Sequence, residues 1–143
     1  MAEAAAERDY SLFGDDHVAK YEATDGEVGY LWNDAPCLVL HTKGRKTGEL
    51  RKFPLIFGER GDDLVLVASK GGAPDHPGWY LNLLANPDAA VQVKADVFPV
   101  HARTAEGDER TELWNLMLEH WPEYTGYQAN TEREIPVVVL ERR

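Results

Sequence analysis

The segment from residue 43 to residue 52 holds the first side chains whose types and spacing suggest chemistry. It reads KGRKTGELRK, with five lysines and arginines and one glutamate. At its centre, Arg45, Lys46 and Thr47 lie between two glycines and offer a guanidinium fork, an ammonium, a hydroxyl and exposed backbone N–H groups. Such donors bind phosphate and carboxylate groups. The segment predicts an anion site, with a solvated basic loop as the alternative, and it lacks the glycine and lysine spacing of a nucleotide-binding P-loop.

Ser69, Lys70 and the two glycines that follow form a second stretch that favours anions. We expect strands over 51–58 and 64–69 to pair as an antiparallel hairpin, which brings the start of the first strand beside the end of the second. A helix predicted over 77–85 begins shortly afterwards, and helix N-termini favour negative charge. Three elements should therefore converge on a small phosphorylated or polycarboxylate ligand.

Two groups of aromatic residues could contact a planar ring. Trp79 and Asn82 share one face of that helix, where they either flank a ring or serve as a core anchor and an exposed polar residue. Trp121, Tyr124 and Tyr127 follow at intervals of three and form a stripe with two hydroxyls. The stripe belongs either to the core or to an adaptable lid over a pocket.

Other kinds of chemistry lack their residue patterns. The five histidines show no metal-ligand spacing, and the one cysteine, Cys37, has no base beside it, so no metal site and no thiol nucleophile is expected. The sequence has no serine nucleophile elbow. If the chain is an enzyme, its chemistry is therefore expected to come from a cofactor.

These residues must be positioned by a mainly β domain. The order of the predicted elements lacks the regular strand–helix alternation of a Rossmann sheet. It predicts an α+β fold, a six-stranded antiparallel barrel with helices inserted between the hairpins. The apolar patterns place strands over 37–42, 51–58, 64–69, 90–95, 97–103 and 136–141, and helices over 15–24, 77–85 and 108–120.

Composition indicates one globular domain of 143 residues, with 1–35 as an N-terminal segment that carries a helix and 36–143 as the barrel. The net charge of −10 argues against nucleic acid and against an anionic membrane surface as partners. No apolar stretch is long enough to span a membrane, the N-terminus does not read as a targeting peptide, and the single cysteine fits a cytoplasmic protein. Residues 43–52 carry +4 in a background of −14.

From about residue 36 to its end, the sequence resembles the deazaflavin-dependent nitroreductase family. The family resembles flavin-binding split β-barrel oxidoreductases, and its actinobacterial members use reduced coenzyme F420, a phosphorylated deazaflavin with a polyglutamate tail. The matching pieces keep the family's order and spacing: GRKTG (44–48), PL (54–55), VASKGGAP (67–74), HP (76–77), WYLNL (79–83), ANP (85–87), WP (121–122), Tyr124, YQ (127–128), Thr131 and IPVVVL (135–140).

The resemblance also implies roles for individual residues. Ser69, Tyr124 and Tyr127 become the catalytic groups, whose hydroxyls hydrogen-bond the acceptor oxygen, and they form the substrate wall together with Ile56 and Trp121. Ile56 and Trp121 stand where tyrosines are expected, which departs from the nitroimidazole-reducing pattern. The cofactor contacts fall on Arg45, Lys46, Thr47, Arg51, Lys52, Phe53, Pro54, Leu55, Ile56, Val67, Ala68, Ser69, Lys70, Gly78, Trp79, Tyr80, Leu81, Asn82 and Tyr124.

The resemblance implies an F420H2-dependent reductase that transfers a hydride to a small electron acceptor. The acceptor would be a quinone, a nitroaromatic, or a conjugated enone or lactone of the coumarin or aflatoxin type. Two alternatives remain open at this point: a split-barrel reductase that uses FMN, and a carrier protein that binds F420 without turnover. The sequence carries no signature that separates a monomer from a homodimer.

Overall fold

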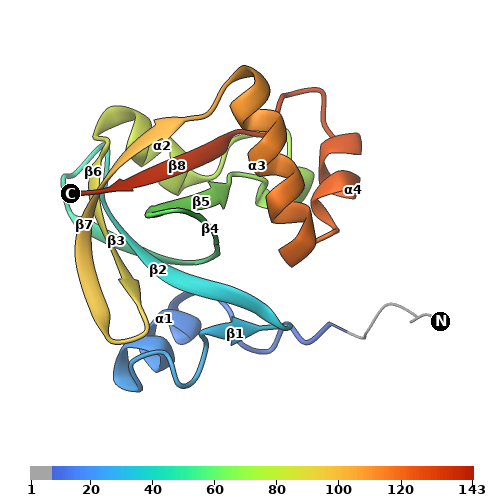
Figure 1. Ribbon diagram of the computed structural model, residues 1–143. Helices are drawn as coiled ribbons and strands as arrows, with labels where there is room; N and C mark the ends of the chain where they lie inside the picture. Colours follow the sequence, from blue (N-terminus) through green and yellow to red (C-terminus); the bar gives the residue numbers. More distant parts are fainter. Residues whose placement is uncertain (1–7) are drawn as a thin grey trace.

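The structure is a computed structural model, and it describes residues 8–143. Within these residues, a mainly antiparallel sheet curls into a half-barrel, with four α-helices at its margins (Figure 1). The elements in chain order are α1 (Gly14–Ala23), β1 (Leu31–Trp32), β2 (Ala35–Lys43), β3 (Leu50–Ile56), β4 (Gly58–Arg60), β5 (Asp63–Val67), the short 3-10 turn η1 (Lys70–Gly72), α2 (Gly78–Ala85), β6 (Asp88–Val93), β7 (Asp96–Thr104), α3 (Gly107–His120), α4 (Tyr124–Ala129) and β8 (Val137–Arg142).

The predicted split barrel is confirmed, although the sheet in the described part of the chain has eight strands and not six. Along the sheet the order is β1-β2-β6-β7-β8-β5-β4, and β3 pairs with β2. The two strands that the sequence did not predict, β1 and β4, have two and three residues. Such short pieces carry too few side chains for an alternating pattern to be recognised.

The predicted hairpin between residues 51–58 and 64–69 is wrong. The chain turns at Phe57, whose N–H donates to the Pro36 carbonyl at 3.0 Å. Before this turn, β3 pairs with β2, and after it, β4 pairs with β5. Because β4 covers β5 only as far as Val65, β3 and the end of β5 face each other without pairing. This opening is the split in the barrel, and Pro54, which lacks an N–H, suits the unpaired edge of β3.

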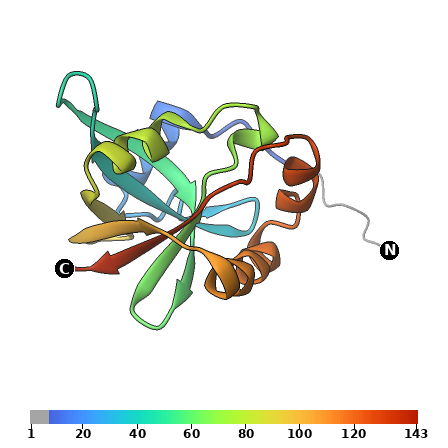
Figure 2. The same cartoon turned by 90° about the horizontal axis from the view of Figure 1, so that it is seen from above.

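Three predicted helices are present as α1, α2 and α3, with bounds shifted slightly. The fourth, α4, forms within the aromatic stripe and begins at Tyr124, after a short turn at Pro122 and Glu123 that follows the end of α3. In Figures 1 and 2, α3 and α4 lie together at one side of the sheet, well apart from α1.

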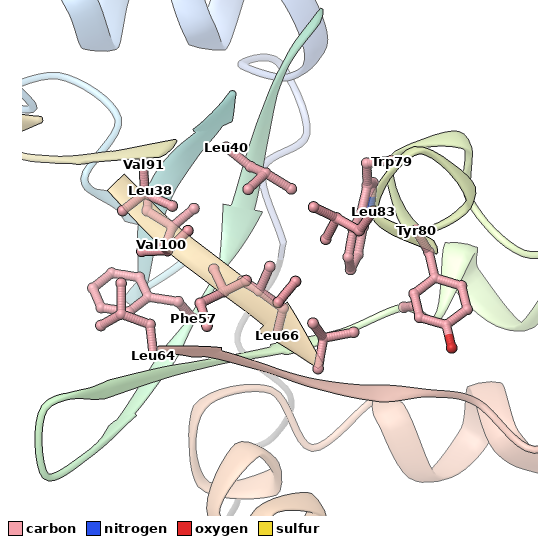
Figure 3. Packing of buried hydrophobic residues seen from close by; sticks show 14 residues of the cluster. Leu38, Leu40, Phe57, Leu64, Leu66, Trp79, Tyr80, Leu83, Val91 and Val100 are labelled. Atoms are coloured by element: carbon pink, nitrogen blue, oxygen red, sulfur yellow. The ribbon is translucent and has the colours of Figure 1, made fainter. Parts of the chain in front are cut away.

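The core forms on both faces of the sheet. On β5, Leu64 and Leu66 point into the barrel, while Val65 and Val67 point to the layer beneath α3. The alternation follows from the two-residue period of a strand, and it explains why both faces of this apolar run are buried. Trp79, Tyr80 and Leu83 of α2 close the first cluster, where Figure 3 draws them beside the strands' leucines and valines.

An ion network fastens α3 to the sheet. Glu109, in the first turn of α3, accepts from Arg60 at 2.7 Å and from Arg103 at 2.6 Å. These bonds lower the pKa of Glu109 to about 2. The network therefore contributes most to stability where Glu109 is ionised. Within residues 8–143, no helix has the length and apolar character needed to cross a bilayer.

Candidate active site

A cavity of about 400 Å³ opens at the split, where β3 and the end of β5 separate. Most of its wall is apolar or aromatic, and the polar side chains in it are few. The lining residues are Phe53, Pro54, Leu55 and Ile56 from β3, Val67, Ser69, Lys70 and Gly71 after β5, Pro77 and Trp79 at α2, Trp121, Tyr124 and Tyr127 near α4, and Phe13, Gly14, His17, Trp32 and Cys37 from the N-terminal part.

A basic hollow adjoins this cavity, since Phe53 lines both. It is lined by Gly44, Arg45, Lys46, Thr47, Arg51, Phe53, Gly78 and Asn82. Arg45 and Lys70 also line one further depression beside His76. The basic loop, the turn after β5 and the start of α2 therefore converge as expected, but the open edges of β3 and β5 bring them together, not a hairpin.

Asn82 holds Arg45 in position through two hydrogen bonds. Its Oδ1 accepts from the backbone N–H of Arg45 at 3.2 Å and from Nη1 at 2.9 Å, and its Nδ2 donates to the Thr42 hydroxyl at 3.1 Å. Asn82 is buried and lines the hollow, so the exposed polar residue that the sequence allowed is wrong. Instead it couples the basic loop to α2.

The cations in and around the hollow differ in their partners. Among the described residues, Arg51 lies 3.5 Å from Glu49 and Lys52 lies 2.6 Å from Glu22 of α1. Arg45, Lys46 and Lys70 form no ion pair with any residue of 8–143. These three charges, which line the cavity or the depressions beside it, are therefore available for an anionic ligand.

Three hydroxyls line the apolar cavity. Tyr127 accepts a hydrogen bond from Trp121 Nε1 at 3.2 Å, which leaves the phenolic hydrogen of Tyr127 free to donate. Burial raises the pKa of Tyr124, so this side chain stays protonated and can act only as a neutral donor or acceptor. Ser69 follows β5 at the start of η1. The three predicted catalytic groups are thus brought into one cavity, while their roles remain a prediction.

Some residues assigned to the cofactor by resemblance do not line the cavity. Lys52 points to α1, and Ala68 is buried with its N–H bonded to the Pro136 carbonyl. Tyr80 packs in the core, where its hydroxyl lies 2.8 Å from that of Thr104. Leu81 borders the depression that Arg45 and Lys70 share.

Residues from the N-terminal part of the chain form one wall of the cavity. The sequence did not show whether this part of the chain reaches the site. Trp32 stacks on Trp121 at 5.3 Å between ring centroids, and the His17 ring lies 6.5 Å from Trp32. Arg8 lies 4.1 Å above the Trp121 ring and pairs with Glu123 at 2.7 Å. No spacing in the sequence links Arg8, His17 and Trp32 to Trp121, because the first three lie about ninety residues or more before it in the chain.

Cys37 and the histidines do not suggest other chemistry. Burial raises the pKa of Cys37 to about 12, so the thiol stays protonated and serves as part of the apolar wall. His101 Nδ1 lies 2.9 Å from Asp88 Oδ1 at the protein surface. In the described part of the chain, no group of three or more histidine, cysteine, aspartate or glutamate side chains could hold a metal ion.

A family model described as F420H(2)-dependent quinone reductase matches residues 15–142, which include all the residues that line the cavity except Phe13 and Gly14. The chain belongs to this family. The F420H(2)-dependent quinone reductase Rv1261c of Mycobacterium tuberculosis is 44% identical over 131 residues, covering 89% of this chain and 88% of that protein. The family assignment agrees with the resemblance that the sequence motifs carried.

Two solved structures share the family's fold. The structure of F420-H2 dependent reductase FDR-A has 44% sequence identity and a TM-score of 0.69, covering 74% of this chain and 94% of that chain. A second, described as a domain-swapped dimer, has 39% identity and a TM-score of 0.73, covering 88% and 92%.

The residues present fit the cofactor for which the family is named. F420 combines a planar ring with a phosphate and a carboxylate-rich tail. The apolar cavity accepts a ring, and the adjoining hollow places Arg45 and Lys46, both without ion-pair partners in 8–143, at the cavity's edge. An anionic tail would satisfy those charges.

Proposed function

We propose that this chain is an F420H2-dependent reductase of quinones. One observation supports it most directly: an apolar cavity at the split in the barrel adjoins a hollow in which Arg45 and Lys46 have no carboxylate partner among residues 8–143. A ligand with a planar ring and an anionic tail would suit both environments. The family model and the curated relative are named for F420H2 and not for FMN, so the FMN alternative is not supported.

Arg45, Lys46 and Lys70 would hold the phosphate and tail of F420, because each presents a charge that no described carboxylate neutralises. The backbone and side chains of 53–56 and the Trp79 indole would bound the ring. When bound in its reduced form, F420 supplies a hydride. The protein's contribution is to hold the ring and the acceptor close together in an apolar space.

Ser69, Tyr124 and Tyr127 would bind the acceptor through its oxygen. Hydride addition to a quinone leaves negative charge on oxygen, and O–H donors fixed in an apolar cavity stabilise such charge. The raised pKa of Tyr124 keeps its hydrogen in place for this bond. Solvent, or the hydroxyl of Ser69 or Tyr127, would then supply the proton that completes the quinol.

Quinones are the first acceptors to test, followed by conjugated enones and coumarin- or aflatoxin-type lactones, and then nitroaromatics. The cavity wall carries Ile56 and Trp121 where the nitroimidazole-reducing pattern has tyrosines. Both substitutions remove a phenolic hydroxyl that could bind a nitro group. We therefore expect weak activity on nitroimidazoles.

The deciding experiment mixes the purified protein with F420H2 and a panel of quinones, and follows the absorbance of oxidised F420. Tight binding of F420, weak binding of FMN and quinone-dependent oxidation are expected. Binding of F420 without oxidation across the acceptor panel would identify a carrier protein. An affinity for FMN that exceeds the affinity for F420 would contradict the cofactor assignment.

Further proposals concern the whole molecule. We propose one domain in which residues 1–35 belong with the barrel of 36–143, and a cytoplasmic protein with no nucleic-acid partner. A homodimer is the oligomeric state to test first against a monomer, because one relative is described as a domain-swapped dimer. Sedimentation velocity distinguishes the two states.

A further inference from the structure

Arg133 lies in the connection between α4 and β8 and reaches across to the loop that follows β5. Its Nε donates to the Ala73 carbonyl at 2.8 Å, and its Nη2 donates to the Ser69 carbonyl at 2.7 Å. Its Nη1 donates to the Ala68 carbonyl at 3.2 Å and lies 3.1 Å from His76 Nδ1. One guanidinium therefore binds both ends of the loop over 68–76.

These contacts are unusual for a partly buried cation. Within residues 8–143 Arg133 has no carboxylate in an ion pair, and burial lowers its pKa. All of its partners are neutral: three backbone carbonyls and one imidazole. Burying a charge without a counter-ion costs free energy, which the four hydrogen bonds offset. The pattern is typical of a side chain that shapes a backbone.

The loop needs such support. Lys70 has φ of +47°, a left-handed conformation that is costly for a residue with a Cβ, and Gly71 and Gly72 continue at +64° and +83°. A turn of this kind cannot satisfy its carbonyls in a regular ladder. The planar fork of an arginine can bind several carbonyls at once, whereas a lysine ammonium cannot reproduce that geometry.

The same loop packs against α4. A Cβ built on Gly72 would lie 2.5 Å from the Tyr127 carbonyl oxygen, so only glycine permits this approach. The loop therefore connects two parts of the site: Ser69 and Lys70 line the cavity on one side, and the helix of Tyr124 and Tyr127 lies on the other.

We infer that Arg133 is a positioning residue for the reaction, and that it acts by holding Ser69 and Lys70 in the conformation that binds the reduced cofactor. Arg133 itself does not line the cavity, so it acts through the loop. The inference rests on the proposed function, since it takes Ser69 and Lys70 as cofactor contacts. It adds a residue that lies outside the matched motifs and about sixty positions along the chain from the loop it supports.

Arg133→Lys tests the inference, because it keeps the charge and removes the fork. Arg110→Lys is the matched control: Arg110 donates to the Ile135 carbonyl at 2.6 Å in the same connection, but from α3 and away from the loop. We expect Arg133→Lys to weaken F420 binding about tenfold or more, as when charge-assisted hydrogen bonds are lost. Arg110→Lys should bind F420 as the parent protein does. Thermal unfolding measures the stability of both variants.

The pattern of kinetic constants separates positioning from general destabilisation. A positioning role raises the KM for F420H2 and leaves the fraction of active sites unchanged. A merely structural role lowers the active fraction and leaves the F420 dissociation constant of the folded molecules as it was. That second result, or equal weakening by Arg110→Lys, would overturn the inference.

A second variant covers the case in which Arg133→Lys does not fold. His76→Phe keeps an aromatic ring against Tyr80, which lies 5.0 Å away, and removes the imidazole acceptor of Arg133. A loss of F420 affinity of about threefold is expected from one weakened hydrogen bond. Unchanged affinity in this variant would count against the inference. If the parent protein itself does not bind F420, the proposed function fails first, so the two failures are distinguishable.

Discussion

Replacing Arg45 by methionine removes one guanidinium from the basic hollow and keeps most of the side chain's apolar stem. In the parent protein, Arg45 Nη1 donates to Asn82 Oδ1 at 2.9 Å, and no carboxylate of residues 8–143 pairs with the charge. A charge-assisted contact to an anionic ligand contributes about 1.5 to 3 kcal/mol. We therefore expect the dissociation constant of F420 to rise about tenfold to a hundredfold.

The cost to folding should be small, because Asn82 keeps two of its partners. Its Oδ1 still accepts from the backbone N–H of residue 45 at 3.2 Å, and its Nδ2 still donates to Thr42. We expect the free energy of unfolding to fall by about 1 kcal/mol, since the bond to Asn82 and a longer one to the Gly78 carbonyl at 3.4 Å are lost and no buried group is orphaned. Denaturant unfolding of the variant checks this value.

The assay is an equilibrium titration with F420 at several salt concentrations. Salt should weaken binding more in the parent protein than in Arg45→Met, since the variant has one charge fewer for ions to screen. Lys43→Met is the matched control, because Lys43 belongs to the same basic segment and lines neither the cavity nor the hollow. If Lys43→Met weakens binding as much as Arg45→Met does, the general charge of the segment matters and the reasoning about Arg45 is refuted.

Three further perturbations test other parts of the molecule. Tyr124→Phe should lower kcat about a hundredfold, as the loss of one hydrogen-bond donor to a developing oxyanion does; an unchanged kcat would exclude the donor role. Glu109→Gln should lower the free energy of unfolding by about 1 kcal/mol at neutral pH, a value that allows for solvent screening. Because the folded pKa of Glu109 lies near 2, below its ordinary 4.5, this difference should be complete above pH 4.5 and disappear as the pH falls towards 2, as measured by denaturant unfolding. Arg8→Ala should raise the acceptor KM and leave F420 affinity alone, since Arg8 contacts Trp121, which we propose as part of the acceptor wall. Steady-state kinetics with each substrate varied in turn will distinguish the two effects.

Local features of the fold were predictable from the sequence. The i, i+3, i+4 pattern of α3 and the apolar runs of β2, β5 and β8 follow from burial, which the side chains express residue by residue. Strand pairing was not predictable in the same way. β3 has apolar residues that would suit β2 or β5 equally, and the choice depends on the turn at Phe57 and on the contact of Phe57 with Pro36.

The candidate site likewise contains residues that the sequence predicts and residues that only the folded structure brings there. Arg45, Lys46, Ser69 and Lys70 lie in short motifs, so their chemistry could be predicted before their positions were known. Arg133 lies between two glutamates in a polar stretch, where a charged residue usually faces solvent. Its four bonds to the loop exist only once the connection before β8 is folded against that loop.

The sequence by itself determined the class of fold, the family and the chemical character of the ligand. Charge and hydrogen-bonding capacity are properties of side chains, so a +4 segment in an acidic chain already indicates an anion. The tertiary structure decided how these groups meet. The cavity exists because β3 and β5 remain unpaired, and its far wall is completed by Trp32 and the residues before it, contacts between distant segments that only packing of the whole chain creates.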